Sequence, residues 1–224
     1  MTDEVFPRSV WDRRAAARPV TIEESAIRAV DFALAVAALV FLAPLMLLIA
    51  MAVFITDPGP IFFAQRRIGH GGVYFRCFKF RSMAVDAEQL LADLIARDPE
   101  ARAEWSKNHK LKNDPRVTAV GSFLRRSSLD ELPQLFNVIM GEMSLVGPRP
   151  IVDAEVSRYG RYFRHYCAVR PGITGLWQIS GRSDVSYRRR VAFDVAYSRT
   201  TSFALYLKII LMTVPAVLYA RGSY

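Results

Sequence analysis

Few residues in this chain could ligate zinc. The 224 residues include only two cysteines, Cys77 and Cys167, and three scattered histidines. Neither residue type shows the close spacing of a zinc site. Two isolated cysteines favour reduced structural thiols in a cytoplasmic domain.

A secretory signal is also missing. Residues 1–25 mix proline, arginine and alanine without a period, which predicts a flexible basic arm. The apolar segment that follows starts too late and is too long to be the core of a secretory signal.

Acidic residues are outnumbered by basic ones. The chain has 30 Lys and Arg against 21 Asp and Glu, a net charge of +9 and a pI near 9.9. Such a surface suits nucleic acid, anionic lipid or a phosphorylated substrate. The sequence lacks the aromatic–basic repeats typical of nucleic-acid platforms. Because hydrophobic residues make up 52% and the mean hydropathy is +0.15, we expect membrane lipid to be a partner and nucleic acid not to be one.

One long run carries no charge. Residues 32–55 are 24 consecutive uncharged residues. As one straight helix they would measure about 36 Å and cross a hydrocarbon core of about 30 Å, so a transmembrane helix is the default interpretation. However, Pro44 interrupts the hydrogen-bond ladder, and basic residues flank both ends, which favours placing both ends on the cytoplasmic side. A helix that bends at Pro44 and returns satisfies both features, so a re-entrant and a spanning helix stay open on sequence grounds.

The chemistry of the chain centres on residues 125–137. Two arginines precede a short serine turn, and two adjacent carboxylates, Asp130 and Glu131, then open an apolar helical pattern. The first turn of a helix stabilises negative charge, so we expect both carboxylates there. From spacing alone, Ser128 and Glu131 also make a capping box, which needs no further function.

Loops rich in glycine, proline and arginine follow at residues 147–150, 170–175 and 181–182. Their backbone N–H groups and guanidinium forks suit phosphate oxygens. A carboxylate pair ringed by arginines can hold a divalent metal and attack a phosphoryl group, because the cations neutralise the phosphate charge.

Periodicity and turn residues predict the neighbouring elements. We expect a half-exposed strand over residues 73–81 after a Gly-Gly turn, and a helix that ends at Gly141. Residues 144–146 read as a short strand, residues 153–166 as a helix, and residues 202–218 as an interfacial helix.

At the central motifs the chain resembles a known family. Residues 128–137, 143–150 and 170–175 resemble the bacterial sugar transferases, which are monotopic polyprenyl-phosphate phosphoglycosyl transferases. The resemblance runs from Ala26 to the C-terminus, with several long motifs in the family's order. The ending, residues 219–224, is similar to short exopolysaccharide-initiating members that use galactose or glucose, and the chain lacks the multi-helix N-terminal region of larger members.

The resemblance implies an enzyme, a UDP-sugar:undecaprenyl-phosphate sugar-1-phosphate transferase. Such an enzyme moves a hexose-1-phosphate from a UDP-sugar to undecaprenyl phosphate through a covalent phosphosugar–aspartyl intermediate and releases UMP. This is the first membrane step of exopolysaccharide biosynthesis. A ping-pong route suits one water-soluble and one lipid-embedded substrate.

The resemblance also implies the site residues. Asp130 is the nucleophile, and Asp130 and Glu131 together hold Mg²⁺. The expected substrate-binding residues are Lys79, Arg81, Arg125, Arg149, Arg182 and Asp194.

Simpler interpretations of these residues stay open. Lys79 and Arg81 fit the solvated face of a strand equally well. Asp194 lies among apolar neighbours and needs a partner such as an arginine or a metal. Arg28 and Asp31, one turn apart, fit an ordinary i,i+3 pair, although the family also carries a basic–Asp pair here.

The expected fold class is α+β and mostly helical. A Pro-broken re-entrant membrane helix is expected over residues 26–56, followed by a small cytoplasmic catalytic domain with interfacial helices over residues 57–224. The resemblance places the protein at the bacterial inner (plasma) membrane, with its catalytic domain on the cytoplasmic face. Homodimerisation stays open.

Two other functions are compatible with the charge and the apolar run. A membrane-bound, non-enzymatic lipid-binding module explains both, but not the carboxylates or the Gly-Pro-Arg loops. A sugar-only glycosyltransferase would release UDP instead of UMP.

Overall fold

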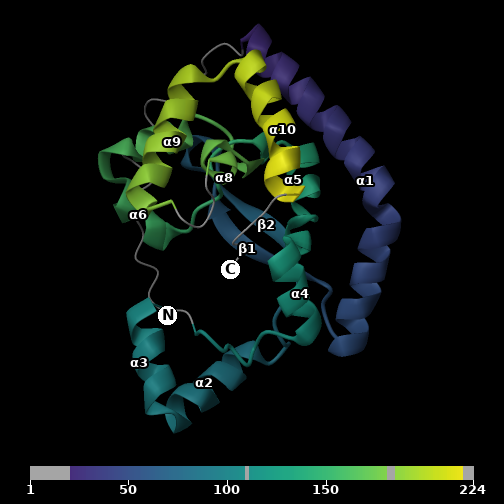
Figure 1. Cartoon of the computed structure of the whole chain (residues 1–224), viewed down its shortest axis with the longest axis vertical. Helices are drawn as coiled ribbons and strands as arrows, with labels where there is room; N and C mark the ends of the chain where they lie inside the picture. The colour runs from purple at the N-terminus through teal and green to yellow at the C-terminus, as the bar shows by residue number, and fades with distance from the viewer. Residues whose placement is uncertain (1–20, 109–110, 181–184, 219–224) are drawn as a thin grey trace. The chain divides into compact units, whose positions relative to one another are not determined.

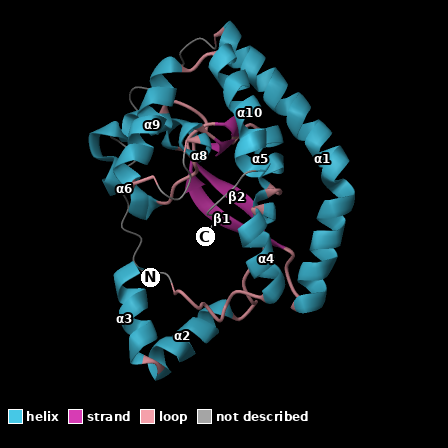
Figure 2. Cartoon of the chain, viewed as in Figure 1, coloured by secondary structure: helices cyan, strands magenta, loops and turns pink. Residues whose placement is uncertain are grey.

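The computed structural model describes residues 21–108, 111–180 and 185–218 and is mostly helical, with two short strand pairs (Figure 2). The described chain divides into two compact units. Of the described residues, the first unit comprises 21–37, 65–77, 135–180 and 185–218, and the second comprises 38–64, 78–108 and 111–134. The mostly helical α+β expectation is therefore confirmed.

The elements in chain order, labelled as in Figure 1, are α1 (Ile22–Thr56), β1 (Phe62–Ile68), η2 (His70–Gly72), β2 (Tyr74–Phe80), α2 (Ala87–Arg97), α3 (Pro99–Asn108), α4 (Ala119–Ser127), η3 (Leu129–Glu131), α5 (Gln134–Met140), β3 (Ser144–Val146), α6 (Asp153–Tyr159), η4 (Gly160–Tyr162), α7 (Phe163–Cys167), β4 (Gly172–Thr174), α8 (Leu176–Ile179), α9 (Tyr187–Thr200) and α10 (Phe203–Leu218).

The long helix α1 begins at Ile22, four residues before the expected start. A capping box explains the difference, because the Glu24 N–H donates to Thr21 Oγ1 at 3.1 Å and the Thr21 N–H donates to Glu24 Oε2 at 2.9 Å. Residues 1–20 of the expected basic arm lie outside the described residues.

From Ile22 the helix continues through Pro44 for 35 residues, about 52 Å at the α-helical rise. By length and composition it is able to cross a membrane. Large apolar side chains such as Val40, Phe41 and Leu47 are more than 70% exposed. Exposed apolar surface of this extent is typical of a face that meets lipid or protein.

The core of the second unit forms where the later turns of α1 meet the end of β2 and α4. Its buried members are Met46, Ile49, Val53, Phe80 and Leu124. α4 comes very close to the segment after β2 because Gly121 has no side chain: a Cβ there would lie 1.9 Å from the Ser82 carbonyl oxygen. This contact fixes α4, and with it the turn that carries the central carboxylates.

The first unit has two apolar clusters. One gathers Ile27, Val146, Tyr197, Tyr206 and Ile209. The other gathers Ile68, Ile151, Tyr159, Tyr166 and Val191. In the first unit α8 packs against both α9 and α10 (Figure 1).

A parallel pair of short strands, β3 and β4, organises the Gly-Pro-Arg loops of the first unit. Ser144 pairs with Gly172, and Val146 pairs with Thr174. The backbone directly after β3 lies very close to the backbone before β4, since a Cβ on Gly147 would lie 2.2 Å from the Arg170 carbonyl oxygen. Residues 147–150 and 170–175 are therefore held against each other.

Most local expectations match the structure. The strand expected at residues 73–81 is β2, the strand at 144–146 is β3, and the C-terminal helix is α10. Gly141 follows α5 with a left-handed φ of +83°, as expected for a helix stop. The helix expected over residues 153–166 is instead interrupted at Gly160, whose φ is +49°.

Candidate active site

The turn that carries Asp130 and Glu131 is built around Ser128. Ser128 adopts a left-handed φ of +57°, and its N–H donates to the carbonyl of Arg125 at 3.3 Å. Its side chain makes no capping hydrogen bond. The capping-box interpretation is therefore wrong. The two carboxylates lie in the 3₁₀ turn η3, before Pro133, and not in the first turn of α5.

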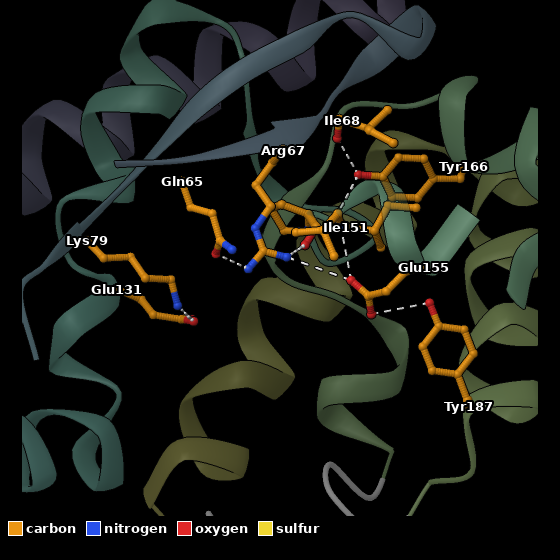
Figure 3. A network of polar contacts seen from close by, with 11 residues as sticks. Gln65, Arg67, Ile68, Lys79, Glu131, Ile151, Glu155, Tyr166 and Tyr187 are labelled. Carbon is orange, nitrogen blue, oxygen red and sulfur yellow. Dashed lines mark hydrogen bonds and ion pairs between the residues drawn. The ribbon is translucent and has the colours of Figure 1, made fainter. Parts of the chain in front are cut away.

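Lys79 of β2 reaches this turn (Figure 3). Its Nζ donates to Glu131 Oε1 at 2.6 Å and lies 3.7 Å from Asp130 Oδ2. The side chains of Lys79, Glu131 and Asp130 are only 18%, 19% and 11% exposed. Charges shielded from water interact more strongly than exposed ones. One ammonium against two carboxylates gives this carboxylate cluster a formal charge of −1.

Arg81 and Arg125 belong to the second unit, as do Asp130 and Glu131. Arg81 directly precedes Ser82 in the sequence, and Arg125 contacts the Ser82 side chain. Arg81 donates to the Asp57 carbonyl and pairs with the Asp57 carboxylate at 3.6 Å. Arg125 is exposed, and its Nε donates to Ser82 Oγ at 2.9 Å. Arg81 therefore secures the segment after α1, whereas Arg125 presents its guanidinium at the surface.

Arg149 lies in the first unit, between two prolines in the loop after β3. It is half-buried. A neighbouring cation is Arg67 of β1, whose pKa is lowered mainly by burial and further by the positive charge of Arg149. The loop therefore brings two guanidinium groups into one small region.

Asp194 of α9 is also in the first unit and is only 3% exposed. The Tyr159 hydroxyl donates to its Oδ2 at 2.6 Å. The expected partner was an arginine or a metal, whereas the hydrogen-bonding partner here is a tyrosine. Burial raises the pKa of Asp194 to about 7, against the opposing effects of the Tyr159 hydrogen bond and the charge of Arg190.

The remaining expected residue, Arg182, lies outside the described residues. Within residues 21–108, 111–180 and 185–218, no group of three or more His, Cys, Asp and Glu side chains is arranged to hold a metal ion. The expectation that Asp130 and Glu131 hold Mg²⁺ therefore stays a prediction.

Sequence reasoning missed the roles of Arg28 and Asp31. Arg28 donates to the carbonyls of Val138 and Ile139 at 2.5 and 2.7 Å, at the end of α5. Asp31 is 1% exposed, and its Oδ1 accepts three hydrogen bonds. The donors are the Leu145 N–H at 2.8 Å, the Tyr206 hydroxyl at 2.8 Å and the Ser144 hydroxyl at 3.1 Å. A carboxylate directly before the uncharged run of residues 32–55 was the available signal.

The family model for bacterial sugar transferases matches residues 22–220 of this chain. The chain belongs to the bacterial sugar transferase family. This sugar transferase is 51% identical over 197 residues to the exopolysaccharide production protein ExoY of Sinorhizobium fredii, covering 88% of this chain and 87% of the relative. It is 48% identical over 218 residues to ExoY of Rhizobium meliloti, covering 97% of this chain and 96% of the relative.

A larger relative carries a more explicit name. The sugar transferase is 48% identical over 197 residues to the undecaprenyl-phosphate galactose phosphotransferase of Salmonella typhimurium. That match covers 88% of this chain but 41% of the relative. The family expectation from the central motifs is therefore confirmed.

The structure of this sugar transferase brings Lys79, Asp130 and Glu131 into one contact network. Arg81 and Arg125 belong to the same unit, whereas Arg149 and Asp194 belong to the other. The roles given to these residues stay predictions.

Proposed function

We propose that this sugar transferase moves a hexose-1-phosphate from a UDP-sugar to undecaprenyl phosphate, as the first membrane step of exopolysaccharide biosynthesis. Two relatives that cover most of the chain are named for exopolysaccharide production, and a third for undecaprenyl-phosphate galactose phosphotransfer. The observation that carries the proposal is the shielded carboxylate pair of η3 in contact with Lys79. A nucleophilic carboxylate with cations beside it suits phosphoryl transfer.

Asp130 is the proposed nucleophile. One of its oxygens forms a bond to the sugar-linked phosphorus, while the bond from that phosphorus to the bridging oxygen breaks and UMP leaves with the electron pair. A phosphate oxygen of undecaprenyl phosphate then attacks the same phosphorus, and Asp130 leaves as a carboxylate. Each step forms one P–O bond and breaks one. The aqueous and the lipid substrate therefore need not occupy the site together.

Lys79 has two proposed effects on this chemistry. It holds Glu131 in place through the 2.6 Å contact, and its charge offsets that of the two carboxylates. An anionic donor approaches a cluster of charge −1 more easily than one of charge −2. The proposed ligands of the substrate phosphates are Arg81, Arg125, Arg149 and Arg182. Asp194, which accepts a hydrogen bond from Tyr159, is proposed to support the substrate site.

Asp130 and Glu131 are the proposed ligands of Mg²⁺. Proteins usually bind Mg²⁺ through one or two carboxylates and leave the other positions to water and substrate phosphate, so the residues present fit this ion. When bound, Mg²⁺ neutralises phosphate charge. Lys79 Nζ already contacts Glu131 Oε1, so the ammonium competes with a metal for this oxygen.

The proposed location is the bacterial inner membrane, with the catalytic residues on the cytoplasmic face. The length of α1 and the exposed apolar side chains along it support membrane association. A re-entrant course is proposed because basic residues flank both ends of the apolar run.

Nucleotide release tests the function. The full chain in detergent, with Mg²⁺ and undecaprenyl phosphate, is given UDP-galactose, UDP-glucose and N-acetylated UDP-sugars in turn. We expect UMP release with one of them, a loss of about 10³-fold or more in Asp130→Asn, and loss on chelation of the metal. Asp93→Asn is the matched control, because Asp93 is a partly exposed carboxylate of α2 that accepts a hydrogen bond from Gln89.

The acceptor-free reaction tests the covalent step. Without undecaprenyl phosphate, we expect UMP release to stop at no more than one molecule per enzyme molecule, since the intermediate then accumulates. Release of UDP instead of UMP would mean a sugar-only transferase and would overturn the role of Asp130. No release with any donor would contradict the enzymatic proposal.

A further inference from the structure

We propose that Arg67 is a positioning residue that fixes the loop carrying Arg149, and so the aim of the Arg149 guanidinium. The functional part of this proposal rests on the phosphate-binding role proposed above for Arg149. The geometric part rests on the contacts of residues 147–152, all within the first unit.

The residues before Arg149 are anchored to β4. The Gly147 N–H donates to the Thr174 carbonyl at 2.8 Å, and the Gly172 N–H donates to the Pro148 carbonyl at 2.8 Å. Because Gly147 and Gly172 lack side chains, the two backbones approach too closely for any other residue. The chain is therefore fixed up to Pro148.

The residues after Arg149 are anchored to β1. Arg67 Nη1 donates to the Pro150 carbonyl at 3.0 Å, and the Ile68 N–H donates to the Ile151 carbonyl at 3.0 Å. Arg149 is thus the one residue between two anchored segments of the loop. Both anchors fix its backbone. Two side chains contribute to the second anchor: Arg67 holds the Pro150 carbonyl, and the Tyr166 hydroxyl accepts from the Ile151 N–H at 3.2 Å.

Arg67 is itself held firmly (Figure 3). Its Nη2 donates to Gln65 Oε1 at 2.6 Å, and its Nη1 lies 3.8 Å from Glu155 Oε2. Glu155 in turn accepts from the Val152 N–H at 3.1 Å and from the Tyr187 hydroxyl at 3.4 Å. The Arg67 side chain is only 15% exposed. This network joins β1, the start of α6 and α9 around the loop.

The guanidinium fork suits this task better than an ammonium. Its planar donors reach Pro150 and Gln65 at the same time, whereas a lysine is a single point charge. Arg67 also repels the nearby guanidinium of Arg149, while Glu155 attracts and compensates Arg67. Repulsion between two like charges disfavours close contact of the two guanidinium groups, so the position of Arg67 also affects that of Arg149.

A double-mutant cycle tests the functional part. We expect Arg67→Met to lower kcat/KM for the UDP-sugar by about 10- to 100-fold, as for a catalytic group displaced by about 1 Å. In the Arg149→Ala background the same change should cost less than about 2-fold, because Arg67 acts through Arg149. Equal losses in both backgrounds would overturn the functional link and leave Arg67 a purely structural residue.

Two further variants keep the test informative if Arg67→Met unfolds. Arg67→Lys retains the charge and should give an intermediate loss, and Glu155→Gln should loosen Arg67 without removing it. Arg66→Met is the matched control, since Arg66 is exposed on the same strand and lies over the Tyr74 ring at 3.7 Å. It should leave kcat/KM unchanged.

Amide hydrogen exchange tests the geometric part independently of turnover. We expect exchange of the peptide covering residues 147–152 to become at least about 10-fold faster in Arg67→Met and to stay unchanged in Arg66→Met. Unchanged exchange in Arg67→Met would overturn the proposal even if the enzyme turns over UDP-sugars. Faster exchange in a protein that releases no UMP would uphold the positioning of the loop and refute only the proposed function.

Discussion

Replacing Tyr159 by phenylalanine should destabilise the protein more at alkaline than at acidic pH. Tyr159 donates a 2.6 Å hydrogen bond to Asp194, a carboxyl that is only 3% exposed. The contribution of this hydrogen bond to stability depends on whether Asp194 carries a charge. Its pKa of about 7 places that change within an accessible pH range.

The direction follows from proton linkage. Burial raises the pKa of Asp194 from 3.8 to about 7, so between these pH values the folded protein holds a proton that the unfolded chain has released. This contribution to stability is fully present below pH 3.8 and is lost as the pH rises through 7. A separation of about three pH units corresponds to about 4 kcal/mol as an upper figure.

The hydrogen bond from the Tyr159 hydroxyl offsets part of the stability that is lost as the pH rises. A hydrogen bond to a charged group contributes about 1.5–3 kcal/mol, whereas one between neutral groups contributes about 0.5–1.5 kcal/mol. Tyr159→Phe should therefore cost about 1 kcal/mol more at pH 8.5 than at pH 5.5. In a chain of this length, 1 kcal/mol corresponds to about 2–4 °C in Tm.

Thermal unfolding of the detergent-solubilised protein at both pH values measures this difference. Tyr162→Phe is a suitable control, because Tyr162 is exposed and its hydroxyl accepts from Arg161. Asp194→Asn should remove most of the extra pH dependence. An equal loss of Tm at both pH values, or a larger loss at pH 5.5, would refute the assignment of this titration to Asp194.

Three other expectations can be tested separately. Lys79→Met removes the cation that lies 2.6 Å from Glu131 and 3.7 Å from Asp130. We expect kcat/KM to fall by about 10²-fold or more, while Tm changes by a few degrees. A normal kcat/KM would contradict the proposed role of Lys79. Gly147→Ala puts a Cβ 2.2 Å from the Arg170 carbonyl oxygen and should cost about 1–3 kcal/mol by thermal unfolding, more than Gly69→Ala, where the nearest atoms lie 3.1 Å from the added Cβ. Cysteine labels at the two ends of α1 should react from the same side of the membrane if the helix is re-entrant, and from opposite sides if it spans.

Features that depend on neighbours in the chain were predictable from the sequence. The β2 strand, the β3 strand and the stop at Gly141 follow from alternation and from a residue that tolerates positive φ. The same kind of reasoning gave a wrong capping box at Ser128, because this residue adopts a positive φ that few non-glycine residues adopt. A left-handed serine ends α4 and starts a 3₁₀ turn, so a spacing that matches a capping box produces a different structure.

Features that depend on distant residues were not predictable in detail. The pattern showed that Asp194 needs a partner, but only the fold brings Tyr159 to it across 35 residues of sequence. The central motif was identified without knowledge of β2, yet Lys79 contacts Glu131 across 52 residues. Local chemistry indicates that a buried polar group must be satisfied, whereas the fold decides which residue satisfies it.

Asp31 is another buried polar group whose partners come from distant parts of the chain. An i,i+3 pair with Arg28 would have contributed about 0.2–0.5 kcal/mol on a helix surface. The carboxylate instead accepts from Ser144, Leu145 and Tyr206, the last of which lies 175 residues away in sequence. A carboxylate on an apolar helix is costly unless donors surround it, so its position marks the turn of α1 that faces protein and not lipid. Within the first unit, Asp31 therefore ties the start of α1 to β3 and α10, directly before the exposed apolar run begins at Phe32.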